Sequence, residues 1–104
     1  MNAKWLIAPI AAAALFVSGQ ASADLDLAKK SGCLACHSVE KKIVGPSWKD
    51  VAAKYKGEAD ARDLLISRVK KGGKGVWGPA PMPPYSPRVT DANIEKLVDF
   101  ILAL

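Results

Sequence analysis

The 104-residue sequence is poor in side chains that bind metals or form crosslinks, since it has two cysteines and one histidine. A structural zinc site usually takes four cysteine or histidine ligands, so these three residues would make a poor one. Two cysteines also leave none for the further disulfides that stabilise many small exported domains. Stability and chemistry must therefore come from some other source.

An apolar run long enough to cross a membrane is also missing. The longest, residues 5–17, has 13 residues, whereas a spanning helix needs about 20. Lys4 precedes this run, and Ala21-Ser22-Ala23 follows it as a small-residue cleavage site. We therefore expect residues 1–23 to be a cleaved secretory signal peptide and residues 24–104 to form a single mature domain. The run's length and Pro9 within it argue against the alternative, an uncleaved anchor.

The charge of the mature segment has no large excess of one sign. Lys4 is the only charged residue before position 24, so the remaining 81 residues carry 14 Lys+Arg and 10 Asp+Glu, a net charge of +4. This balance is too weak and too interspersed for a nucleic-acid-binding protein, but it suits acidic partners. A chain this short also struggles to bury enough apolar surface by itself.

No stretch alternates polar and apolar residues as a strand would, and the pattern predicts four short helices. The first covers Asp24–Lys30, and the second follows a capping-box-like start at Ser47 and ends at Gly57. The third runs up to Lys71, and the fourth follows Thr90. Helical spacing assigns the buried faces of the last three helices: Trp48, Val51, Ala52 and Tyr55; Ala61, Leu64, Leu65, Arg68 and Val69; Ile94, Leu97, Val98, Ile101 and Leu102.

Residues 33–37 read Cys-Leu-Ala-Cys-His, the attachment pattern of a c-type haem. Each thiol can add to one vinyl group of the porphyrin, and the adjacent histidine is then held beneath the iron as its proximal ligand. A thioredoxin-like redox pair would need a βαβ context, which the sequence does not indicate. A plain disulfide between residues three apart would constrain the unfolded chain little. Both alternatives stay open at this point. A haem would also supply the apolar core that the short chain lacks.

The segment 72–88 holds four glycines and five prolines between two predicted helices. A loop of this length in a small domain is more often functional than idle, and its prolines stiffen it. Met82, the only methionine after residue 23, stands between two of these prolines. A thioether is a soft, neutral ligand that suits haem iron opposite an imidazole. We therefore expect Met82 to be the second axial ligand, while a role in filling a core gap is the alternative.

These motifs, together with Val-Gly-Pro at 44–46, Gly-Val-Trp-Gly-Pro at 75–79 and Pro-Met-Pro-Pro at 81–84, resemble small bacterial class I cytochromes c of the c-551/c-552 type. The resemblance covers essentially the whole mature chain. It implies an all-α fold, with about four short helices wrapped around one covalently bound haem c. It also implies thioether bonds to Cys33 and Cys36, with His37 and Met82 as the axial ligands of the iron.

Three further roles are implied by the resemblance alone. The Pro46 carbonyl would accept the free N–H of His37, and Arg68 and Trp77 would reach the haem propionates. One departure lies shortly after Pro-Met-Pro-Pro, where family members often have an asparagine and this chain reads Tyr85-Ser86-Pro87-Arg88. Any hydrogen bond from that asparagine to the methionine sulfur would need another donor here, for which Ser86 is a candidate.

With both axial positions filled by protein, the iron has no site for a substrate, which favours outer-sphere electron transfer over catalysis. We expect a soluble periplasmic monohaem carrier. Two alternatives stay open: a five-coordinate haem enzyme or gas sensor if Met82 does not bind iron, and a thiol–disulfide enzyme without haem. The resemblance implies a membrane cytochrome complex as donor and a nitrite reductase, peroxidase or terminal oxidase as acceptor. A monomer is expected, with no stable membrane insertion. Lysines near the motif and the loop could steer acidic partners: Lys29, Lys30, Lys41, Lys42, Lys70, Lys71 and Lys74.

Overall fold

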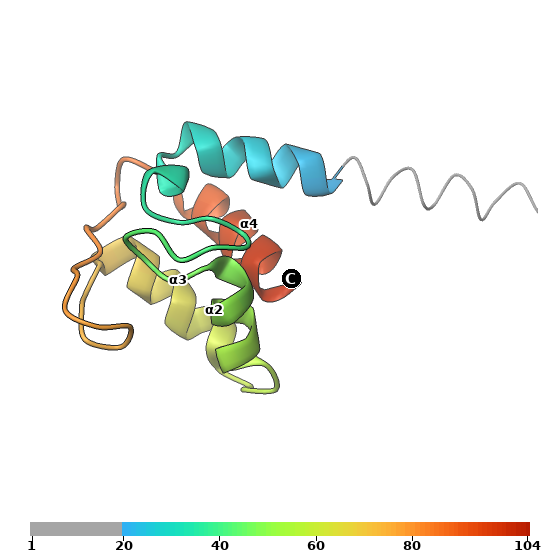
Figure 1. Ribbon diagram of the computed structural model, residues 1–104. Helices are drawn as coiled ribbons and strands as arrows, with labels where there is room; N and C mark the ends of the chain where they lie inside the picture. Colours follow the sequence, from blue (N-terminus) through green and yellow to red (C-terminus); the bar gives the residue numbers. More distant parts are fainter. Residues whose placement is uncertain (1–19) are drawn as a thin grey trace, which may run out of the picture.

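The structure is a computed structural model that describes residues 20–104 (Figure 1). Within this range a helix covers residues 20–30, and the 3₁₀ turn η2 (Cys33–Ala35) follows it. Three further helices are α2 (Trp48–Tyr55), α3 (Ala61–Lys71) and α4 (Asp91–Leu102). Residues 20–104 contain no regular strand, only two isolated backbone bridges. The predicted all-α class is therefore confirmed.

The start of α2 is set by the Ser47 side chain, which accepts a hydrogen bond of 3.1 Å from the Asp50 N–H. This is the capping interaction that the sequence predicts, because a serine oxygen at this position satisfies a free N–H of the first turn. The four apolar residues assigned to the inner face of α2 are all buried. One of them, Trp48, is thereby placed beneath the histidine of the 33–37 motif, as described below.

The face of α3 differs from the prediction at one position. Ala61 and Leu65 are buried, whereas Leu64 is 41% exposed. The prediction of a buried Leu64 was wrong, because only Ala61 and Leu65 of α3 are buried where this helix packs against α4. Arg68 and Val69 are half-buried and line a cavity instead of a closed core.

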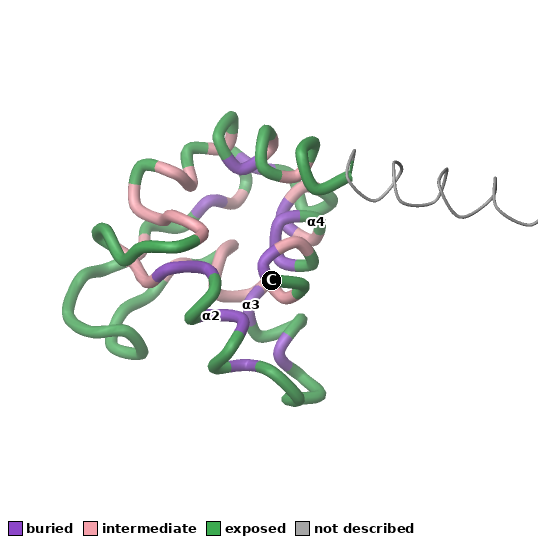
Figure 2. Tube along the Cα trace, turned by 45° about the vertical axis from the view of Figure 1, so that its right-hand side comes forward, coloured by how far each residue is buried: buried purple, intermediate pink, exposed green. Residues whose placement is uncertain are grey.

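Helix α4 lies at the centre of the core and packs against both α3 and α2. Ile94 and Val98 are its most deeply buried side chains, and Ala28 joins them from the helix at residues 20–30. Figure 2 shows that buried positions gather where these helices face one another, whereas the long loop after α3 is largely exposed. Helices α2 and α3 both pack against α4, and residues of all three helices line the cavity described below.

Residues 1–19 lie outside the described part of the chain, so the expected signal peptide and its cleavage after residue 23 stay predictions. The expected first helix, residues 24–30, falls within the helix described at residues 20–30. Among the described helices, none is both long and apolar enough to span a bilayer.

Candidate functional site

The two cysteines are presented by the tight turn η2. Gly32 precedes the turn with a φ of 85°, a left-handed conformation that suits glycine. The N–H groups of Cys36 and His37 then donate to the carbonyl of Cys33, at 3.2 and 3.0 Å. Both thiols are free, half-buried and part of the lining of one large cavity. The turn therefore places two sulfurs and the imidazole beside the same space.

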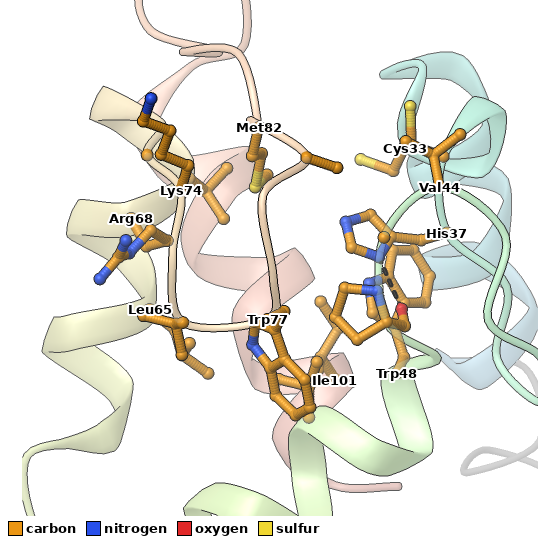
Figure 3. A pocket seen from close by; sticks show the side chains of 18 of the residues that line it. Cys33, His37, Val44, Trp48, Leu65, Arg68, Lys74, Trp77, Met82 and Ile101 are labelled. Atoms are coloured by element: carbon orange, nitrogen blue, oxygen red, sulfur yellow. Dashed lines mark hydrogen bonds between the residues drawn. The ribbon is translucent and has the colours of Figure 1, made fainter.

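The orientation of the His37 ring is set by two contacts. Its Nδ1 lies 2.8 Å from the Pro46 carbonyl oxygen, so Nδ1 carries the proton and donates it. The ring also stacks on Trp48, with centroids 5.6 Å apart and planes inclined by 24°. The ring faces the cavity (Figure 3). The imidazole is thus held in one orientation, with Nε2 as the nitrogen that can bind a metal.

Gly45 lies directly against the same ring, and sequence reasoning missed this contact. A Cβ at position 45 would stand 2.6 Å from His37 Cε1 and 3.0 Å from Nδ1, closer than two carbon-sized atoms can approach. The N–H of Gly45 also donates to the Cys36 carbonyl at 2.8 Å. The sequence offered one signal for this contact: Gly45 directly precedes Pro46, the residue whose carbonyl was expected to accept the hydrogen bond from His37.

The opposite wall of the cavity is a hairpin formed by residues 73–82. Its base is closed by two backbone hydrogen bonds between Gly73 and Met82, at 3.0 and 2.8 Å. Gly72 has a φ of 72°, and a side chain there would clash with the backbone of Met82 and Pro83. After the hairpin, the N–H of Tyr85 donates to the Val69 carbonyl of α3 at 3.1 Å. Met82 is therefore fixed by its backbone on both sides.

Met82 and His37 lie on opposite sides of the cavity (Figure 3). Arg68 and Trp77 also line it, and a Cβ on Gly73 would stand 2.6 Å from Arg68 Nη1, so this guanidinium packs closely against the hairpin. Within residues 20–104, no hydrogen bond joins the Ser86 hydroxyl to the Met82 sulfur. The backbone N–H of Ser86 donates to the backbone carbonyl of Lys70. All site residues expected from the sequence line this one cavity: Cys33, Cys36, His37, Pro46, Arg68, Trp77 and Met82.

The cavity has the size and chemistry for a flat apolar cofactor that holds a metal. Its empty space is about 1220 Å³ when the solvent at its mouth is included. Its walls are largely apolar, with contributions from all three helices α2, α3 and α4: Val51, Tyr55, Leu65, Val69, Leu97, Val98 and Ile101. An imidazole nitrogen and a thioether sulfur face it from opposite walls, and two thiols stand at its edge. This donor set fits haem iron and a porphyrin with two vinyl groups.

The alternatives without haem fit the structure less well. Burial raises the pKa of the Cys33 thiol, and this effect outweighs the lowering by the backbone and by Arg88. A thiol–disulfide enzyme needs the reverse, because the thiolate is the attacking species. Among residues 20–104, no group of three or more histidine, cysteine or acidic side chains is arranged to hold a metal ion. Both findings favour the haem interpretation of the motif.

Comparison with known proteins agrees with this site. Residues 25–104 match the family described as Cytochrome c. The chain belongs to this family. It is 52% identical to cytochrome c-552 of Nitrosomonas europaea over 104 residues, which span 100% of this chain and 99% of that protein. It is 56% identical to cytochrome c-551 of Allochromatium vinosum over 91 residues, or 88% of this chain and 96% of that protein.

A solved structure shows the same fold. The crystal structure of wild-type cytochrome c552 from Nitrosomonas europaea matches with a TM-score of 0.74 and 52% identity, over 77% of this chain and 98% of that one. This class I cytochrome c therefore carries one covalently bound haem c, and it is an electron carrier rather than an enzyme. Its partners are accordingly redox proteins.

Proposed function

We propose that this cytochrome is a periplasmic carrier of single electrons whose haem iron is bound by His37 and Met82. The observation that carries the proposal is the placement of these two side chains on opposite walls of one apolar cavity. Cys33 and Cys36, at the edge of the same cavity, would form the two thioether bonds. The hydrogen bond from His37 to Pro46 keeps the ring in one orientation and strengthens it as a donor.

The haem, when bound, supplies an iron that gains and loses one electron. His37 and Met82 would together hold the iron, which would leave no position on the metal for a substrate. A neutral thioether and an apolar pocket both disfavour the additional positive charge of ferric iron, which raises the reduction potential. The backbone hydrogen bonds at the base of the hairpin hold Met82 in place, which limits rearrangement during electron transfer.

Arg68 and Trp77 supply polar groups on an otherwise apolar wall. Haem carries two propionate groups, and burying their charge requires hydrogen-bond donors or a cation nearby. A guanidinium packed against Gly73 and an indole on the neighbouring hairpin meet this need. Arg68 on α3 and Trp77 on the hairpin are therefore the residues that would hold the propionates.

Intact mass and optical absorption of the exported, purified protein test the proposal together. We expect the mass of residues 24–104 plus one haem, because the signal peptide is removed and the thioether bonds are covalent. The oxidised protein should also show the absorption band of a methionine–iron bond. A mass equal to the bare polypeptide would contradict haem attachment, and a missing band would favour the five-coordinate alternative.

The partners would bind at the cavity mouth, where Lys74 is exposed and lines the opening. Lys70 fits this role less well, because its ammonium lies 3.3 Å from a carboxylate oxygen of Asp91. Acidic surfaces suit a cation at the electron-transfer site, because long-range attraction raises the rate of encounter.

Reversing the charge of Lys74 should slow the reaction with an anionic oxidant. For Lys74→Glu we expect the rate constant with hexacyanoferrate(III) to fall about three- to fivefold at low salt, and the difference to shrink as salt screens the charges. Lys96→Glu is the matched control, since Lys96 is exposed on α4 and does not line the cavity. Equal effects of the two variants would show that only net charge matters.

A further inference from the structure

The tip of the 73–82 hairpin has few backbone hydrogen bonds to support it. Its base is closed at Gly73 and Met82, and one further hydrogen bond of 3.0 Å joins the Gly75 N–H to the Gly78 carbonyl. Trp77 stands at this tip and is 40% exposed. Two of its near neighbours, Gly75 and Gly78, have no side chain that could contact the indole ring. What keeps this ring at the cavity must therefore come from another element.

That contact comes from α2. The ammonium nitrogen of Lys54 lies 5.8 Å from the centroid of the Trp77 ring and 5.7 Å from that of Tyr55. Both distances are within the range of an attractive cation–π interaction, for which tryptophan is the best partner. Tyr55 is buried in the cavity wall, so it gives the lysine a fixed base. No salt bridge joins Lys54 to any acidic residue among the described residues.

We propose that Lys54 is a positioning residue that holds the Trp77 indole over the cavity. The lysine extends from α2, the helix whose first residue, Trp48, supports His37. The indole belongs to the hairpin that carries Met82. Figure 3 shows Trp77 at the lower end of the cavity, between Leu65 and Ile101. Through its contact with this ring, Lys54 joins the two walls of the site. The inference rests on the proposed function in one respect, namely that this cavity holds the haem.

This role differs from that of a steering lysine. Lys54 acts through its contact with two rings. A substitution that keeps a positive charge at the same place should therefore preserve the position of the Trp77 indole. A lysine that only attracts partners would leave the hairpin tip unaffected when it is removed. Sequence reasoning did not include Lys54 among its functional lysines, because neither the motif nor the loop is near it in the chain.

Hydrogen exchange of the Trp77 indole N–H in the ¹⁵N-labelled holoprotein tests the proposal. Lys54→Met removes the charge and keeps an apolar stem, and it should speed this exchange about two- to fivefold, the factor that corresponds to an exposed cation–π contact. Lys54→Arg should exchange like the wild type. Lys56→Met is the matched control, because it makes the same charge change two residues away without an aromatic contact among those found. The indole N–H signal of Trp77 is assigned by its absence from the spectrum of Trp77→Phe.

Two outcomes would overturn the proposal: exchange in Lys54→Met that equals the wild type, or an equal increase in Lys56→Met. Exchange of the hydrogen-bonded backbone N–H groups of Gly73 and Met82 is followed in the same spectra, and it should not change. An increase there too would mean that the whole hairpin opens, which contradicts a role confined to its tip. The methionine–iron band in the same samples reports separately on the proposed function.

Discussion

Met82→Ala is expected to lower the reduction potential by on the order of 100 mV or more, a fraction of the roughly 0.8 V span that axial ligands control. The neutral thioether favours ferrous over ferric iron, and alanine has no donor to replace it. The variant should also bind carbon monoxide in the ferrous state, because one axial position is no longer filled by protein. Potentiometry and a carbon monoxide difference spectrum measure the two effects.

Val76→Ala is the matched control for this change. Val76 belongs to the same hairpin, lines the same cavity and is 45% exposed, but it has no donor atom. Val76→Ala should change the reduction potential only slightly, and its ferrous iron should still not bind carbon monoxide. An unchanged potential in Met82→Ala, together with no binding of carbon monoxide, would show that Met82 only fills space.

Gly45→Ala should destabilise the protein and disturb His37, although the change adds a single methyl group. The new Cβ would stand 2.6 Å from His37 Cε1. The ring has little room to move, because it stacks on Trp48 and donates to Pro46. Overpacking of this kind costs about 1–3 kcal/mol, and each 1 kcal/mol lowers the Tm of a domain this small by about 4–8 °C. Thermal unfolding of the holoprotein measures the loss.

A loosened hydrogen bond to Pro46 would also make the imidazole a weaker donor, so Gly45→Ala should raise the reduction potential. Gly57→Ala provides the comparison. Gly57 has a φ of 83° and no heavy atom within 4 Å of an added Cβ, so alanine there costs backbone strain of about 1–2 kcal/mol without touching the site. Both variants should melt earlier, but only Gly45→Ala should shift the potential. A shift of the same size in Gly57→Ala would remove the steric explanation.

The chemistry of this protein can be recognised from its amino-acid sequence. A single histidine directly after two cysteines and one methionine between prolines leave few possible ligands, so the donor set could be stated without coordinates. The helices were also predictable, because capping residues such as Ser47 and the 3.6-residue spacing of apolar side chains are local properties. Local patterns of this kind do not depend on what lies across the domain.

The contacts between these parts follow from the three-dimensional packing and not from any local pattern. The closeness of Gly45 to the imidazole, the reach of Lys54 to the Trp77 ring and the exposure of Leu64 all depend on where segments distant in the chain come to rest. No periodicity encodes such contacts, since each depends on the packing of α2, α3 and α4 around one cavity. The residues that bind can thus be recognised from their types, whereas the residues that hold them in place become visible only through distances in space.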